Sequence, residues 1–307
     1  MIWSFSNPLP SGRYLNLPFF RGSQPFFRSS EYILILFFSY TTVLAFVLPV
    51  SRTVRLVMPL TNVIVLGGLL LLAYADSLRR GRLLGVLRDW FPSPLALLAY
   101  REIGWLAQPH TSSVLEDAWV ILDRLLLNQW GFRTVIEALG PVLPSILDIA
   151  YSFVYPMLPF SLVMLYVYRR HQRVDALFFN FLLAVLGAYA VFPLFTSEPP
   201  WTVFPGQDYP TFNTVFRRFN EAMLRSQGIH TSVFPSTHVA GSFSIALAMV
   251  RLLPEHRWVG RALLVLATLI AVATVYGRYH YAVDAIAGFA VSLAATVVAV
   301  EKERSGR

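Results

Sequence analysis

The sequence predicts an all-α fold, a polytopic membrane helical bundle with about eight transmembrane helices. Of its 307 residues, 56% are hydrophobic and only 14% are charged, whereas soluble domains carry about a quarter charged residues. The apolar residues are also gathered into blocks of about 20, the length of a helix that crosses a bilayer. A large soluble helical core is the alternative, and the block lengths argue against it.

Most of the expected spans are uninterrupted apolar blocks. The third is the exception, because Arg101 and Glu102 fall inside it. Charges at membrane depth are costly and usually face the bundle interior. This segment therefore either crosses the membrane with its charges turned inward or lies at the interface. The expected spans are residues 31–50, 57–75, 92–107, 142–168, 176–196, 237–253, 259–277 and 280–299.

Composition excludes several classes of site. The chain has no cysteine, so it has no disulfide, no thiolate nucleophile and no cysteine metal ligand. Its net charge is +8, and Lys302 is the only lysine among 25 basic residues. A basic balance suits contact with anionic lipid headgroups, and it also follows from positively charged cytoplasmic loops. No nucleic-acid-binding motif is present.

The placement of arginine predicts the orientation. Three basic segments lie on one side of the last five expected spans, and the positive-inside rule makes that side cytoplasmic. The loop 197–236 then faces the periplasm, the cell exterior or an organelle lumen, and eight spans put both termini in the cytoplasm. The basic segments contain Arg169, Arg170 and Arg173; Arg251, Arg257 and Arg261; and Lys302, Arg304 and Arg307.

Residues 111–140 connect two expected spans on the outward side. Apolar side chains such as Val120 and Leu127 alternate there with acidic ones such as Glu116 and Asp123. This pattern predicts an amphipathic helix that either lies on the membrane or packs on the surface of the domain.

Two short motifs stand on either side of a hydrophobic hairpin. The first is Phe234-Pro235-Ser236-Thr237-His238, and the second is His280-Tyr281-Ala282-Val283-Asp284. Each motif begins an apolar stretch. Because two crossings separate them, both motifs return to the same membrane face. Two histidines and one carboxylate then converge where lipid headgroups lie.

The spacing in these motifs predicts a role for each residue. His280 and Asp284 are four apart and would share one helix face, where the carboxylate orients the imidazole as a nucleophile. Ser236 is a good N-cap, and the helix it starts offers free N–H groups to a phosphate. His238 in the first turn can protonate a leaving oxygen. These are the parts of an in-line phosphoryl transfer through a phosphohistidine.

Two alternatives stay open on these residues alone. The histidines and the aspartate could be structural groups at a membrane interface, since H-x-x-x-D alone occurs often by chance. They could also bind zinc, although no other acidic residue or histidine completes a tight ligand pattern. The joint occurrence of both motifs at matched ends of a hairpin favours catalysis without a metal.

The motifs P-S-x-H and H-x-x-x-D, placed across a helical hairpin, resemble those of the phosphatidic acid phosphatase type 2 (PAP2) superfamily. The stretch Leu194–Trp201 is similar to the L-F-x-x-x-P-P-W stretch of its Aur1/Ipt1 inositolphosphotransferase branch, as is Leu122–Leu126. The resemblance covers residues 80–300. It implies a six-helix catalytic core, transfer through a phosphohistidine without a metal or cofactor, and the roles of His238, His280 and Asp284 given above.

The chain departs from the superfamily pattern in its cations. No K-x6-R-P run precedes the first motif, and Thr274 stands where an arginine usually lies six residues before the second histidine. The phosphate therefore needs another positive group, and Arg278 is the nearest in sequence. Asp148 and Tyr151 either line the site or pair with neighbouring helices. The predicted substrate-binding residues are Ser236, Thr237, Arg278, Arg217, Arg218 and Glu198.

Together these observations predict a membrane-embedded lipid phosphotransferase whose active site faces outward. A lipid phosphatase with water as acceptor is the first alternative, and a non-catalytic membrane protein that keeps the fold is the second. The expected partners are membrane lipids as substrates. The chain divides into an N-terminal segment 1–80 with two spans, a catalytic membrane domain 81–300 and a cytoplasmic tail 301–307.

Overall fold

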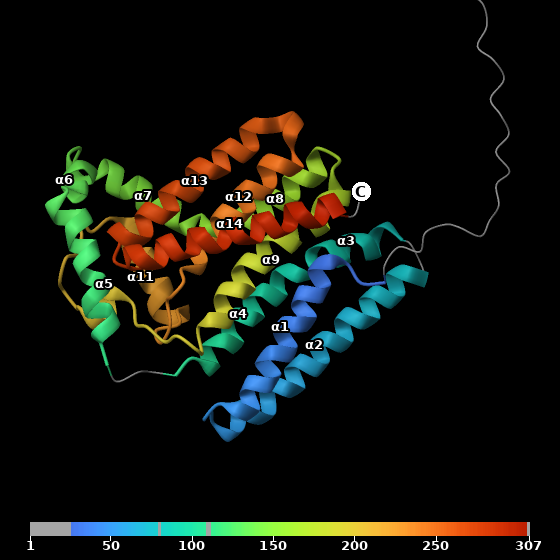
Figure 1. Ribbon diagram of the computed structural model, residues 1–307. Coiled ribbons are helices and arrows are strands. Elements are labelled where there is room, and N and C mark those ends of the chain that lie inside the picture. The colour runs from blue at the N-terminus through green and yellow to red at the C-terminus, as the bar shows by residue number, and fades with distance from the viewer. Residues whose placement is uncertain (1–25, 79–80, 109–111, 306–307) are drawn as a thin grey trace, which may run out of the picture.

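The computed structural model describes residues 26–78, 81–108 and 112–305, and every regular element in these ranges is a helix (Figure 1). This confirms the predicted all-α fold. Residues 1–25 of the expected N-terminal segment and Arg307 of the expected tail lie outside the described residues. The described part of that tail continues the last helix as far as Ser305.

The helices follow the expected spans closely, with short helices between them. The N-terminal helices are α1 (Ser29–Val47), α2 (Arg52–Leu78), α3 (Arg82–Trp90) and α4 (Pro92–Leu106). The next are α5 (Val114–Arg124), a π-helical turn (Leu125–Gln129), α6 (Phe132–Glu137), α7 (Val142–Ser152), α8 (Val154–Val167), a 3₁₀ turn (His171–Arg173) and α9 (Val174–Val191). The last are α10 (Pro200–Val203), α11 (Val215–Gln227), α12 (Thr237–Leu252), a 3₁₀ turn (Pro254–His256), α13 (Arg257–Tyr276) and α14 (Ala282–Ser305).

Length and apolarity identify fewer than eight candidate membrane spans among the described residues. Five helical segments among the described residues are long and apolar enough to cross a bilayer, and a sixth is formed if the bent pair α7 and α8 counts as one span. Helix α12, with 16 residues, is apolar but shorter. The polytopic membrane fold is thus supported, and the count of eight is not confirmed.

The expected single span 142–168 is not one straight helix. It consists of two helices, α7 and α8, which bend by 62° at Phe153. Pro156 supplies the physical reason, because it has no N–H to donate to the carbonyl of Ser152 and its ring crowds that carbonyl. The bend lies beside the histidines, and Tyr155 at the start of α8 contacts the His238 ring edge-on.

The doubtful segment 92–107 forms α4, which has 15 residues. Its two charges point in different directions. Glu102 is fully buried and accepts a hydrogen bond of 2.9 Å from the hydroxyl of Thr41 on α1, whereas Arg101 is exposed. The acid therefore holds two helices together inside the protein, as expected for an ionisable group at membrane depth.

Helix α12 lies at the centre of the bundle, between α9, α13 and α14 (Figure 1). Small residues cover its surface, and neighbouring helices approach closely for that reason. A Cβ atom on Gly241 would lie only 3.1 Å from Val185 of α9. Because its neighbours bury it almost completely, α12 fixes the position of His238 in its first turn.

The bundle has two distinct ends. Helix α9 begins near Asp175 at one end and is followed at the other by Phe192, which lies close to the histidines. Helix α12 runs in the opposite sense, so its last residue, Leu252, lies beside Arg173 at the first end. In Figure 1, α5 and α6 mark the histidine end, and the C-terminus lies at the other.

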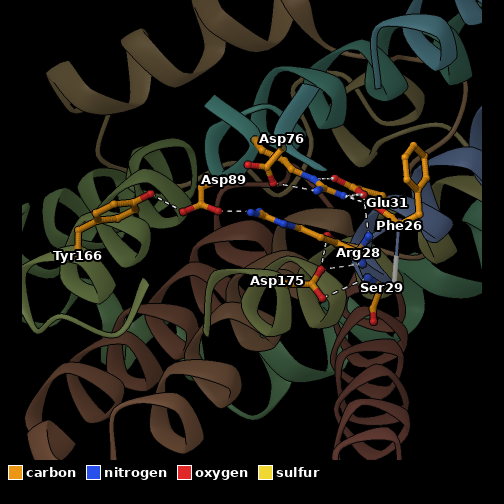
Figure 2. Close-up of polar contacts among 10 residues, drawn as sticks. Phe26, Arg28, Ser29, Glu31, Asp76, Asp89, Tyr166 and Asp175 are labelled. Atoms are coloured by element: carbon orange, nitrogen blue, oxygen red, sulfur yellow. Dashed lines mark hydrogen bonds and ion pairs between the residues drawn. The ribbon is translucent and has the colours of Figure 1, made fainter. Parts of the chain in front are cut away.

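A buried arginine organises the end remote from the histidines, and its carboxylate partners Glu31 and Asp76 are labelled in Figure 2. Arg88 of α3 is 7% exposed. Its Nε and Nη2 atoms donate to both carboxylate oxygens of Glu31, at 2.6 and 2.7 Å, and its Nη1 lies 3.0 Å from Asp76. One guanidinium thus joins α1, α2 and α3.

A second set of contacts extends this network to the rest of the bundle. Asp89 pairs with Arg28 at 2.6 Å and accepts a hydrogen bond from the Tyr166 hydroxyl on α8. Asp175 accepts from both the N–H and the hydroxyl of Ser30, at the start of α1 (Figure 2). The N-terminal helices are therefore fastened to α8 and α9 by polar contacts.

We expect Arg88→Ala to lower the free energy of unfolding by about 3–5 kcal/mol, because it leaves the Glu31 carboxylate buried and unpaired. Arg304→Ala is the matched control, since it removes an exposed pair with Glu301 and is expected to cost less than about 1 kcal/mol. Thermal unfolding of both variants in detergent measures the difference. Equal losses in the two variants would show that the network does not hold the helices together.

Candidate active site

The first motif starts α12 as the sequence predicts. Ser236 is the N-cap, and its hydroxyl accepts a hydrogen bond from the N–H of Val239 at 3.4 Å. The N–H of Ser236 in turn donates to the carbonyl of Asp284 at 3.0 Å, which joins the two motifs directly. A Cβ atom on Gly288 would lie 2.3 Å from the Ser236 carbonyl, so only glycine allows α14 to approach this closely.

The two histidines are in direct contact. His280 Nε2 lies 3.4 Å from His238 Nδ1, and His280 Nδ1 lies 3.4 Å from Asp284 Oδ2. The carboxylate thus faces one ring nitrogen of His280, while the other nitrogen faces His238. A phosphate bound between the two rings requires that they move apart.

His280 reaches this place in a different way from that predicted. It precedes α14, which begins at Ala282, so His280 and Asp284 do not share a helix face. The loop 277–281 places the imidazole instead, with the N–H of His280 donating to the Thr274 carbonyl at 3.0 Å. Burial of His280 in this loop lowers its pKa to about 4. Its imidazole is therefore neutral near pH 7, with one nitrogen lone pair available.

Tyr151 of α7 completes the contacts of His238. Its hydroxyl lies 3.3 Å from His238 Nε2, and the two rings stack with centroids 5.0 Å apart. Of the two residues that the sequence left undecided, Tyr151 faces the site. Asp148 pairs with a neighbouring helix, since the Thr214 hydroxyl at the start of α11 donates to it at 2.7 Å.

A small cavity of about 30 Å³ opens onto both histidines, and it is called the histidine cavity below. Its walls come from α4, α7, α10, α11, the start of α12 and the loops around the two motifs. No arginine, lysine or acidic residue of the described chain is among its lining residues, which are Tyr100, Tyr151, Phe192, Pro199, Trp201, Leu224, Gly228, Ile229, His230, Ser232, Val233, Thr237, His238, Tyr279 and His280.

The predicted phosphate cation Arg278 does not line this cavity. Its side chain is fully buried, and its Nη1 pairs with Asp123 of α5 at 2.6 Å. The other Asp123 oxygen accepts a 2.7 Å hydrogen bond from the N–H of Ala282, the first residue of α14. Through Nη1, Arg278 thus positions the loop that carries His280, while its Nε and Nη2 are buried without a hydrogen-bond partner.

The other predicted binding residues are divided between three places. Thr237 lines the histidine cavity. Arg217 lies in a neighbouring hollow, and Arg218 lines a separate one beside Asn213. Glu198 does not line the cavity either, although its N–H donates to Glu116 of α5 at 2.9 Å.

Helix α5 has the polarity opposite to that of a soluble surface helix. Its buried residues are Glu116, Val120 and Asp123, while Val114 and Ile121 are exposed. The acidic face thus binds the site loops, and the apolar face is turned away from the protein, as suits a helix at a membrane interface. Both expected features, the amphipathic pattern and the packing on the domain, are present.

Aromatic rings join the remaining family-like stretch to the motifs. Trp119 of α5 contacts Phe195, Phe234 and Tyr281 with ring centroids 5.4–5.9 Å apart. The stretch 194–201 therefore supports both motifs from one side, and its Pro199 and Trp201 also line the cavity.

Sequence reasoning missed two groups. Asp123 was recognised only as an acidic residue of the amphipathic segment and as part of a family-like run, and nothing in the nearby sequence shows that it pairs with Arg278, 155 positions away. Tyr100 of α4 lines the cavity, and its hydroxyl accepts a 2.8 Å hydrogen bond from the N–H of Ile229.

Comparison with known proteins gives two matches. A family model described as the PAP2 superfamily matches residues 118–298. A PA-phosphatase related-family protein of Dictyostelium discoideum is 29% identical over 128 residues, which are 40% of this chain and 22% of that protein. The match thus spans about a fifth of that relative's length. No solved structure matches the chain.

We expect Asp123→Asn to reduce turnover by about 10²-fold, because it leaves Arg278 buried without a counterion and frees the loop that holds His280. Asp117→Asn is the matched control on the same helix, since Asp117 is exposed and bonds only locally to Ser113. Turnover of a labelled phospholipid by the two purified variants measures the effect. Full activity in Asp123→Asn would rule out the positioning role.

Proposed function

The chain belongs to the PAP2 superfamily, and from that premise we propose that it is a membrane-embedded lipid phosphotransferase that works through a phosphohistidine. The superfamily and the phosphatase-related relative support lipid phosphatase or phosphotransferase chemistry in general. The observation that carries the proposal is the convergence of His238 and His280 at one cavity, with Asp284 buried beside the far nitrogen of His280.

In the first step, His280 Nε2 attacks phosphorus. A P–N bond forms as the P–O bond to the leaving lipid oxygen breaks, and His238, which must enter this step as the imidazolium beside the phosphate anion, donates its proton to that oxygen. Asp284, beside Nδ1, keeps the proton on that nitrogen and stabilises the positive charge that develops on the ring. The start of α12 offers N–H groups to the phosphate oxygens. The Tyr151 hydroxyl lies beside His238 in the first turn of that helix.

In the second step, a hydroxyl acceptor attacks the phosphohistidine. His238, now neutral, takes the proton of that hydroxyl as the new P–O bond forms and the P–N bond breaks. His280 returns to its first state. The same scheme gives a phosphatase when water is the acceptor, so the catalytic trio does not distinguish transfer from hydrolysis.

The charge of the cavity supports the transfer version. No cation of the described chain lines it, and a phosphate monoester dianion is hard to hold without one. A phosphodiester carries a single negative charge, so a phospholipid with a headgroup suits this cavity better than a terminal phosphate. The Leu194–Trp201 stretch, which resembles the Aur1/Ipt1 branch, also favours transfer of a phosphoryl headgroup to a lipid hydroxyl.

The proposal includes metal independence and orientation. The zinc alternative needs His238, His280 and Asp284 to converge on one ion, and the described residues contain no group of three His, Cys, Asp or Glu side chains arranged to hold a metal ion. Arginines such as Arg170 and Arg173 gather at the end of the bundle remote from the histidines. By the positive-inside rule that end is cytoplasmic and the site is extracytoplasmic.

We expect His280→Asn to abolish turnover, and His238→Asn and Asp284→Asn to reduce it by about 10²–10⁴-fold. His171→Asn, an exposed histidine at the opposite end, should leave it unchanged. The assay follows phosphatidic acid and labelled diester phospholipids in mixed micelles containing a chelator. Unchanged activity in His280→Asn would support a non-catalytic protein, and loss of activity with the chelator would support a metal enzyme.

A second experiment separates the two acceptors. Labelled diester phospholipid is incubated with the purified protein, with and without a lipid alcohol. We expect label to move into a new lipid only when the alcohol is present. Release of headgroup phosphate at the same rate without the alcohol would identify a hydrolase.

A further inference from the structure

A second hollow lies directly beside the histidine cavity, and it is called the vestibule below. The two spaces share Trp201, Leu224 and Tyr279. The ring of Tyr279 lies 4.3 Å from that of Tyr151, which in turn stacks on His238. A group bound in the vestibule is therefore separated from the histidines by little more than these rings.

The vestibule contains a fixed and incompletely bonded cation, Arg217. Its side chain is only 5% exposed. Its Nη2 donates to the Gly277 carbonyl at 3.1 Å, and its Nε lies 3.0 Å from the Glu221 carboxylate. The guanidinium carbon lies 5.7 Å from the Tyr209 ring and 5.8 Å from the Tyr279 ring. The third nitrogen, Nη1, is buried and has no hydrogen-bond partner.

The vestibule encloses about 10 Å³ and this nitrogen is buried, so an anion reaches it only when the walls of the vestibule move apart. A buried guanidinium N–H without an acceptor is costly, and the oxygens of a phosphate are its best acceptors. Arg225 adds a second cation, with its guanidinium 5.6 Å from the ring of Trp201. Glu221 is the opposing charge in the vestibule, and it already pairs with Arg217. The lining of the vestibule thus holds two cations and one carboxylate, and the Asp148 carboxylate acts on Arg217 from outside this lining.

We propose that the vestibule binds a second phosphate group of the substrate, one carried on the headgroup beyond the phosphate that reacts at His280. The inference rests on the proposed function for the place of the reacting phosphate. The histidine cavity has no cation and takes the singly charged diester, whereas Arg217 and Arg225 take the more highly charged end group. The substrate class is thus a phospholipid whose headgroup is itself phosphorylated.

Two matched soluble probes test this on the full chain in detergent micelles. One is methyl propyl phosphate, a dialkyl phosphate, and the other is the same diester with a second phosphate at the end of its propyl chain. Binding is followed by the shift in Tm and by inhibition of labelled phospholipid turnover. We expect the doubly phosphorylated probe to bind the wild-type protein at least about 10-fold more tightly.

Variants test whether Arg217 causes the preference for the doubly phosphorylated probe. Arg217→Gln should abolish the preference while leaving the affinity for the simple diester within about twofold, and Arg217→Lys should keep part of it. Glu221→Gln should strengthen the preference, because it removes the competing carboxylate. Arg218→Gln, at the adjacent position but in a different hollow, should change nothing.

Several results would overturn the inference. Equal binding of the two probes to the wild-type protein would do so, as would an equal weakening of both in Arg217→Gln, which would mean that Arg217 only supports the Gly277 carbonyl. If Arg217→Gln does not fold, Arg217→Lys and Glu221→Gln carry the test. Absence of turnover with a preserved difference in Tm shift would count against the proposed function but not against the vestibule.

Discussion

The buried ion pair between Asp123 and Arg278 is the interaction on which the site depends. Both side chains are fully buried, and the two oxygens of Asp123 are divided between the Arg278 guanidinium and the N–H of Ala282. Arg278 has a φ of 64°, in the left-handed region, which costs energy for a residue other than glycine. The contacts of Asp123 with Arg278 and Ala282 hold the loop between α13 and α14 in this conformation. They thereby fix the position of His280 in that loop.

The rest of the structure makes this local constraint effective. Hydrogen bonding of Ser236 to Asp284 and the small size of Gly288 hold α12 against α14, so His238 and His280 keep a fixed relation. At the other end of the bundle, the Arg88 network fastens the N-terminal helices, and α4 thereby presents Tyr100 to the cavity. Residues outside the family-matched range thus shape part of the site.

Two arginines near the site, Arg217 and Arg225, line the vestibule and not the histidine cavity. Superfamily membership supports phosphoryl chemistry at the histidines, yet Arg278 lies outside the histidine cavity with its Nη1 paired to Asp123, and Arg217 lies in the vestibule on the other side of the Tyr279 ring. A neutral cavity beside a vestibule that holds two cations favours a diester at the reacting centre and a second anion beyond it. Specificity would then arise from the loop 197–236 and not from the catalytic trio.

The sequence by itself determined the helical membrane fold, the two motifs, the Ser236 cap and the family, because apolar block length and short-range spacing are local properties. It did not determine the bend at Phe153, the span count or the way His280 reaches Asp284. Only the tertiary structure assigned Arg278 to Asp123, which lies 155 residues away, and Arg217 to a separate hollow. The role of a buried arginine depends on which charged residue lies next to it. Helix packing, and not the nearby sequence, decides which residue that is.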